Sequence, residues 1–327
     1  MRRLARLQVA LGLLWVVDAL LQLQPDELGR GLSSSMVDGA MAQPAWIQSL
    51  LVDGARAVAR EPVATSLAVA TVQLLLGAAI LVPRTRRAGL LASVPWALAV
   101  WLFGEGLGGV ATGFASAAVG APGAALLYAA AALALLPPRG RPASSDASGR
   151  DAGDGQWPPA RFGVLGEHGV ELLWGGLWAA LAALQSVPVV TLGFKLSAGF
   201  QMASLGEPAA LASMDHLLGS AVAHHGTAAT AALVTLELAA GSAALARGAW
   251  RRRLLWLALG TCTLLWAVGE DLGGLLTGSA SDVGTLPVYG ILAACLLAPR
   301  RPGRWTSASR TSTVPAPTSA PPHASVG

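Results

Sequence analysis

The sequence predicts an all-α, polytopic membrane protein whose eight transmembrane helices form two parallel four-helix repeats. Three observations support this. The 327 residues are 54% hydrophobic and only 12% charged, whereas a soluble domain carries about 25% charged residues. The apolar residues fall into blocks that are long enough to cross a hydrocarbon core of about 30 Å. One segment also occurs twice, as WLFGEGLGGVATGFAS at 101–116 and WAVGEDLGGLLTGSAS at 266–281, which indicates a duplicated unit.

The apolar blocks define both the spans and the domain limits. Each block is predicted to be a helix because a segment in lipid must satisfy its own backbone hydrogen bonds. The spans lie at about 7–24, 64–82, 88–104, 122–137, 167–185, 227–246, 253–268 and 285–298. The first repeat is predicted at 1–138 and the second at 161–300. The linker at 139–160 and the tail at 301–327 are rich in Pro, Ser and Gly, a composition typical of disorder.

Arginines set the predicted orientation. They cluster before the first span, between the second and third, in the linker, between the sixth and seventh, and after the eighth. The opposite ends carry only Arg30, Arg56, Arg60 and Lys195. Because cytoplasmic loops are enriched in Lys and Arg, both termini and the linker are expected in the cytoplasm. This distribution explains the basic pI of about 9.8 without a nucleic-acid partner.

The outer loops at about 25–63 and 186–226 are long and contain Pro44 and Pro208, each of which could open a helix. After Pro44, residues such as Ile47, Leu51 and Val58 give an apolar face at helical spacing. Two interpretations stay open: an amphipathic helix on the outer membrane surface, or a helix that packs over the mouth of the bundle.

Acids inside the predicted spans are the main functional indicators, because an ionisable group in the bilayer costs about 2.5–3.5 kcal/mol on insertion scales. Glu237 lies near the middle of the sixth span, and its counterpart in the first repeat is Gln73. Asp18 lies in the first span, where the second repeat has Leu181. These groups could serve in a proton relay or bind a ligand. They could also be neutral carboxyls that hold helices together.

The repeated segment places a tryptophan and a glutamate one turn apart at the outer end of a helix. Each tryptophan is expected at interfacial depth. A glutamate at a helix C-terminus opposes the macrodipole and needs compensation. The segment is predicted either to line an outer mouth or to be a helix-ending turn kept for packing. Its residues in the two repeats are Trp101, Glu105 and Thr112, and Trp266, Glu270 and Thr277.

Several chemistries find no support in the sequence. Cys262 and Cys295 both lie in apolar blocks, which gives no disulfide framework and no thiol redox centre. We expect no metal site, because the spacing of Asp215, His216, His224 and His225 fits no established ligand pattern; a solvated outer-loop cluster is expected there. Nucleotide-binding loops and hydrolase motifs are also missing.

The second span of each repeat has a polar residue four positions before a glycine, and a basic turn follows. The first repeat has Gln73, Gly77 and the turn at 84–87; the second has Glu237, Gly241 and the turn at 247–253. This pattern resembles the DoxX/DoxD-like four-helix membrane superfamily over roughly 4–137 and 165–298. The chain also resembles uncharacterised membrane proteins of high-GC bacteria. The resemblance implies a module of the bacterial cytoplasmic membrane, with Gln73 and Glu237 at the family's second-span polar position.

Three functions are consistent with the sequence. The first, which the resemblance implies, is a module that binds a quinone or another small molecule beside a membrane or periplasmic oxidoreductase, and that is not an enzyme on its own. The second is a proton-coupled transporter of small solutes. The third is a scaffold or assembly factor without a ligand. In each case the bilayer is the expected partner and nucleic acid is not.

Overall fold

The computed structural model describes residues 2–137, 163–187, 192–203 and 208–297, and residues 1–297 form one compact unit. Every regular element in the described ranges is helical, which confirms the predicted all-α class. The predicted linker and tail lie outside these ranges.

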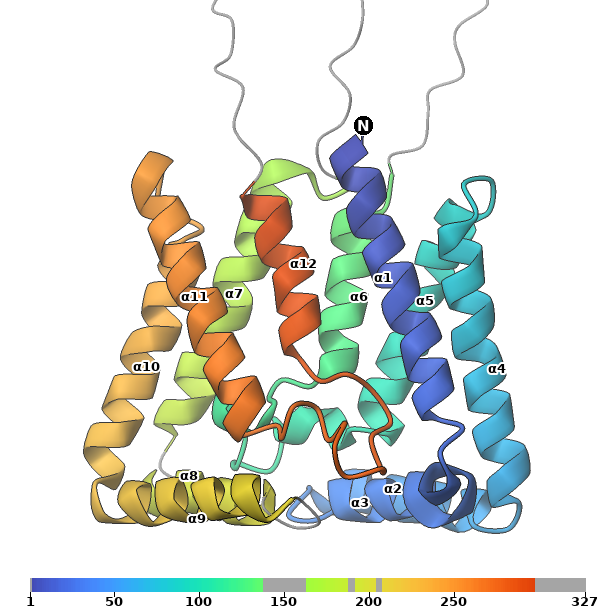
Figure 1. The fold of residues 1–327 in the computed structure, drawn as a ribbon, viewed down its shortest axis with the longest axis horizontal. Coiled ribbons are helices and arrows are strands. Elements are labelled where there is room, and N and C mark those ends of the chain that lie inside the picture. The colour runs from blue at the N-terminus through green and yellow to red at the C-terminus, as the bar shows by residue number, and fades with distance from the viewer. Residues whose placement is uncertain (1, 138–162, 188–191, 204–207, 298–327) are drawn as a thin grey trace, which may run out of the picture. The chain divides into compact units, whose positions relative to one another are not determined.

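The two halves of this unit, 2–137 and 163–297, contain helices in the same order. In each half most helices run alongside one another, and the others lie across their ends on the side away from the N-terminus (Figure 1). The first half comprises α1 Arg2–Leu21, α2 Leu32–Gly39, α3 Ala45–Val58, α4 Pro62–Leu81, α5 Arg86–Phe103 and α6 Ala124–Leu135. The second half comprises α7 Gly166–Ser186, α8 Leu192–Ala203, α9 Ala209–His224, α10 Gly226–Ser242, α11 Gly248–Val268 and α12 Leu286–Leu296.

The lengthwise helices differ in their capacity to cross a bilayer. Two described helices, Arg3–Leu21 and Pro62–Leu81, are long and apolar enough to do so. The helices α6 and α12 are apolar but have only 12 and 11 residues, which is about 16–18 Å at 1.5 Å per residue. By length and composition, two of the described helices could cross a bilayer, and the full set of eight spans stays a prediction.

The transverse helices α3 and α9 begin directly after Pro44 and Pro208, as the two prolines predicted. Ile47 and Leu51 of α3 are buried and pack with Ala40 and the partly buried Leu107. The helix α3 thus packs on the end of α2 and on the segment that follows α5, while Trp46 is 68% exposed. The helices α2 and α8, which lie beside them, were not predicted.

Glycines allow the closest helix crossing in each half. A Cβ atom on Gly77 of α4 would lie 2.8 Å from the carbonyl oxygen of Gly12 in α1. In the second half, a Cβ atom on Gly241 of α10 would lie 3.6 Å from the carbonyl oxygen of Gly175 in α7. The glycine of the polar-x-x-x-Gly pattern is therefore a packing residue at these crossings.

The loops that precede α6 and α12 pack against opposite halves. We call residues 104–123 the first loop and residues 269–285 the second loop. Gln24 of the first half donates a hydrogen bond to the Ala280 carbonyl of the second loop, at 3.3 Å. In return, Ala118 of the first loop packs with Leu196, Phe200, Leu233 and Val268 of the second half. Each half thus packs against the loop that belongs to the other half.

Candidate ligand-binding cavity

The two repeated tryptophans make the same hydrogen bond in both halves. The indole Nε1 of Trp101 donates to the Pro122 carbonyl at 2.6 Å. The indole Nε1 of Trp266 donates to the Val283 carbonyl at 2.9 Å. In both loops the residue after that carbonyl is a glycine with positive φ, Gly123 or Gly284, a conformation that favours glycine. Each tryptophan therefore fastens the end of its loop to the preceding helix.

The two repeated glutamates cap the helix that follows each loop. Glu105 Oε1 accepts from the backbone N–H of Ala125 in α6, at 2.8 Å. Glu270 Oε2 accepts from the backbone N–H of Thr285 at the start of α12, also at 2.8 Å, and Glu270 Oε1 accepts from the Thr285 hydroxyl. The N-terminal dipole of the next helix offsets the unfavourable position of each glutamate at the C-terminus of the preceding helix. The matched glutamates thus have a structural role in both halves.

The repeated threonines stabilise their own turns. The Thr112 hydroxyl donates to the Gly109 carbonyl, and the Thr277 hydroxyl donates to the Gly274 carbonyl, both at 2.7 Å. Thr112 also lines a cavity of about 490 Å³ between the two loops, which we call the central cavity. Glu105 and Glu270 line this cavity as well, whereas Thr277 does not. The structure thus brings together three of the four residues predicted for an outer mouth.

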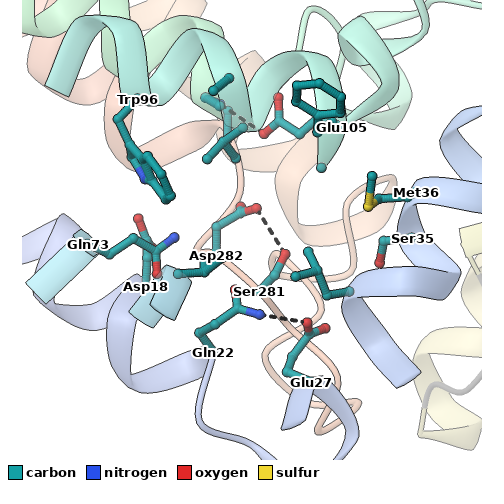
Figure 2. A pocket seen from close by; sticks show the side chains of 18 of the residues that line it. Asp18, Gln22, Glu27, Ser35, Met36, Gln73, Trp96, Glu105, Ser281 and Asp282 are labelled. Atoms are coloured by element: carbon teal, nitrogen blue, oxygen red, sulfur yellow. Dashed lines mark hydrogen bonds between the residues drawn. The ribbon is translucent and has the colours of Figure 1, made fainter. Parts of the chain in front are cut away.

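A second cavity, of about 330 Å³, lies inside the first half and is called the first-half cavity here. Figure 2 shows side chains of the first half and of the second loop converging on it. Its apolar lining comes mainly from α2, α3, α4 and α5 and includes Met36, Val58, Val69, Val100 and Phe103. Its polar and aromatic lining includes Trp15, Asp18, Gln22, Glu27, Gln73, Trp96, Glu105, Tyr128 and Asp282.

This cavity contains three of the site residues predicted from the sequence: Asp18, Gln73 and Glu105. Glu237, the counterpart of Gln73, does not line it; that side chain is fully buried in α10 of the other half. Glu105 lines both this cavity and the central cavity, as does Asp282. These two carboxyl groups therefore lie where the cavities adjoin.

The acids of the cavity differ in their hydrogen bonding. The Gln22 amide donates to Glu27 Oε2 at 3.0 Å, and the Ser281 hydroxyl donates to Asp282 Oδ2 at 3.4 Å. Asp18 is 2% exposed and lies near Tyr128 and Val283, but its Oδ1 atom and the Tyr128 hydroxyl have no hydrogen-bond partner. The groups around these acids are neutral or acidic, because the lining contains no Lys, Arg or His.

Some polar atoms of the lining have no partner. The Oε1 atom of Gln73, a residue that is only 4% exposed, has no hydrogen-bond partner. The indole nitrogens of Trp15 and Trp96 are also buried without a partner. A buried polar group without a hydrogen bond costs about 1–3 kcal/mol. Asp18 Oδ1, Glu105 Oε2 and the Tyr128 hydroxyl are also buried without a partner, so several acceptors and donors are available to a molecule in the cavity.

Burial raises the pKa of the acids that lie outside the predicted spans. Burial first, and then the charge of Asp282, raises the pKa of Glu105 to about 8. Burial raises the pKa of Glu27 to about 7, with Asp26 adding to the shift. The pKa of Asp282 is also raised by burial. At neutral pH Glu105 is therefore mainly protonated and Glu27 is about half protonated, whereas both would be ionised in water.

Asp18 and Asp282 of the cavity have apolar counterparts at the matching positions of the other copy. Leu181 stands where the first half has Asp18, and the first loop has Ala117 where the second loop has Asp282. Trp174, Trp178 and Tyr289 form a buried aromatic group whose ring centroids are 5.1–6.2 Å apart. The acid-lined arrangement thus belongs to the first half.

The sequence analysis missed Asp282. The signal was present, because the repeated segments end in Ala-Ser and are followed by Ala117 in one copy and Asp282 in the other. It also missed the buried ion pair in which Arg251 Nη1 donates to Glu171 Oε1 at 2.6 Å. Glu171 occupies the position of Gln8 in the first half, which instead donates to the Leu135 carbonyl.

The predicted outer-loop cluster is partly corrected. His216, His224 and His225 are exposed, but Asp215 is 1% exposed in α9, so its assignment to a solvated cluster was wrong. Asp215 is buried because it lies on the same side of α9 as Gly219, which packs against Ser197 and Phe200 of α8. Among the described residues, no group of three His, Cys, Asp or Glu side chains could hold a metal.

A comparison of this chain with protein-family models, with curated proteins and with solved structures found no match, so its resemblance to the DoxX/DoxD-like superfamily stays a prediction.

Proposed function

We propose that this chain is an eight-span membrane protein, built from two duplicated units, that binds a small molecule in the first-half cavity. The cavity carries the proposal: apolar side chains form most of its walls, and buried donors and acceptors without partners line it. Its volume of about 330 Å³ is near the lower end of the range of ligand sites, about 300–1,000 Å³.

Exposed apolar side chains support the membrane part of the proposal. Leu20 of α1, Leu75 of α4, Trp256 and Leu264 of α11 are each at least 60% exposed. They lie on long helices rather than in one patch, and more such residues occur on α5, α7 and α10. In a membrane, lipid would cover these side chains.

The positions of the arginines support the predicted orientation in the membrane. The Arg-rich turns before α5 and α11 lie at the same end of the bundle as the N-terminus (Figure 1). At this end Arg3 donates to the Ala294 carbonyl at 3.0 Å, and Arg87 donates to the Pro137 carbonyl. We propose that this end faces the cytoplasm of a bacterial cell.

A ligand-binding test follows from the cavity. Ala99 lines it, whereas Leu98 on the same turn of α5 is 41% exposed. Ala99→Phe should fill the cavity, and Leu98→Phe is the matched control. We would record thermal unfolding in detergent with menadione, benzyltrimethylammonium or neopentylbenzene. At least one probe should stabilise the wild type and the control, by about 2.7 kcal/mol at 100 times its dissociation constant, but not Ala99→Phe.

If no probe stabilises the wild type, or if Ala99→Phe responds as the wild type does, the binding proposal fails. A scaffold without a ligand would then be favoured. The quinone and the partner oxidoreductase implied by the family resemblance are tested by the menadione arm and by purification from the native membrane.

A proton-coupled transporter is a second candidate. It is favoured by Glu105 and Asp282, which line both cavities and so connect the interior of the first half with the space between the loops. Proton-driven uptake of a probe into vesicles would support it, provided that Ala99→Phe abolishes the uptake and Leu98→Phe does not.

A further inference from the structure

We propose that the first-half cavity binds a small organic cation and that binding displaces a proton from the acidic lining. This inference rests on the proposed binding function and adds the charge of the ligand. Figure 2 shows Asp18, Glu27, Glu105 and Asp282 around one space, and all four line the cavity. They reach it from α1, from the turn at Glu27–Gly31, and from the two loops.

The charge of the lining selects the sign of the ligand. The lining residues include four acids and no basic residue. An anion would find no opposite charge in the lining, and any carboxyl that ionises would repel it strongly in a site of low dielectric. A cation would satisfy one ionised carboxylate and so remove the cost of burying it alone. The lining therefore favours a cation over an anion of the same size.

The other walls favour an organic cation over a metal ion. Trp15, Trp96 and Tyr128 line the cavity, and the rings of Trp15 and Tyr128 pack edge to face with centroids 4.6 Å apart. Aromatic rings attract ammonium groups through their π faces. By contrast, no three His, Cys, Asp or Glu side chains in the described ranges could hold a metal together. A substituted ammonium ion fits the apolar walls and the acids together.

Proton release is expected because the lining contains several titratable groups. Tyr128 and the four acids are the titratable groups of the lining; Asp26 acts on Glu27, and Glu270 on Glu105. The helices α2, α3, α4 and α5 add no charged group to the lining. A protonated carboxyl would ionise as the cation enters: its O–H bond breaks, the carboxylate keeps the electron pair, and the proton leaves to solvent. The net charge of the site then stays constant.

The test uses the full chain in detergent and three probes of matched size. Benzyltrimethylammonium is the cation, neopentylbenzene its neutral isostere, and benzylsulfonate the anion. Calorimetric titration should give at least tenfold tighter binding of the cation than of either other probe. Its dissociation constant should fall between pH 6 and 8, by up to tenfold per unit for one displaced proton. Titrations in two buffers of different ionisation enthalpy should detect the released proton.

Asp282→Asn and Asp282→Ala should weaken cation binding at least tenfold. The alanine variant installs the residue that the first loop carries at the matching position, Ala117, and an unchanged unfolding temperature would show that it folds. Asp53→Asn, on the exposed side of α3, should bind as the wild type does.

The results separate this inference from the function on which it rests. If neopentylbenzene binds as tightly as the cation and Ala99→Phe abolishes both, the cavity binds small molecules but the inference about charge is wrong. Tighter binding of benzylsulfonate, cation binding independent of pH, or full affinity in folded Asp282→Ala would also overturn it. If no probe of any charge binds, both proposals fail.

Discussion

Glu105 and Glu270 illustrate what a single residue does in this fold. Each lies just after one long helix and caps the next, accepting a backbone N–H at 2.8 Å. Only Glu105 also borders the first-half cavity. The duplicated motif made both residues identifiable from the sequence, and their position after a helix predicted that they need a partner. The partner itself could not be predicted, because it lies 15–20 residues later, across an irregular loop.

The pH dependence of stability tests the burial of these carboxyls. The pKa is raised from 4.5 to about 8 for Glu105, and to about 7 for Glu27 and Glu270. Their contribution to stability is therefore complete below about pH 4.5 and is lost as the pH rises through 7–8, with a slope of up to about 1.4 kcal/mol per pH unit for each proton. Thermal unfolding in detergent should occur at lower temperature at pH 8 than at pH 5.

Glu105→Gln keeps an acceptor for the Ala125 N–H but cannot ionise. This substitution should reduce the pH dependence of the unfolding temperature between pH 7 and 8. Glu61→Gln, at an exposed position, should leave the profile unchanged. A profile that is identical for Glu105→Gln and the wild type would show that Glu105 is not buried as described.

At the scale of elements, apolar blocks predicted where the lengthwise helices lie, and Pro44 and Pro208 predicted where α3 and α9 begin. The starts of α1 and α11 were predicted less well, because both helices begin in the Arg-rich segments that precede their apolar blocks. The helix α2 was missed because LSSSMVDG has few apolar residues. It forms because Met36 is buried among tertiary contacts, which local sequence does not encode.

Two glycine substitutions should have opposite effects on helix stability. Gly77→Ala should destabilise the protein by about 1–3 kcal/mol, as overpacking does, because its Cβ would press on the backbone of α1. Gly260→Ala, in α11, meets nothing within 4 Å and should stabilise by about 0.5–1 kcal/mol, since alanine loses less backbone freedom. Unfolding by denaturant in mixed micelles measures both. Equal effects of the two substitutions would contradict the close crossing of α1 and α4.

At the scale of the whole molecule, the loops join the halves. The sequence predicted two similar units, but it could not predict that the second loop supplies Asp282 to a cavity of the first half. Such contacts depend on how the halves pack. The two repeated segments are similar in sequence, so the sequence does not show whether each loop packs in its own half or in the other half. The apolar blocks and arginines, by contrast, predicted an orientation in the membrane.

That orientation can be tested by thiol labelling. Cys262 and Cys295 are buried, so a membrane-impermeant maleimide should react little with the wild type in intact cells. Ser49→Cys on α3 and Thr85→Cys in the turn before α5 are both at exposed positions. Only Ser49→Cys should react in intact cells, and both should react after permeabilisation. Labelling of Thr85→Cys alone would place the arginines on the outer side.

The exchange of loops between halves is the claim on which the cavity depends, and crosslinking tests it most directly. In a chain with both native cysteines replaced by alanine, a short bifunctional maleimide should join Gln24→Cys to Ala280→Cys, because these residues share a hydrogen bond of 3.3 Å. Val187 occupies the position of Gln24 in the second half. Crosslinking of Val187→Cys to Ala280→Cys, with none between Gln24→Cys and Ala280→Cys, would show that the second loop stays in its own half and contradict the account.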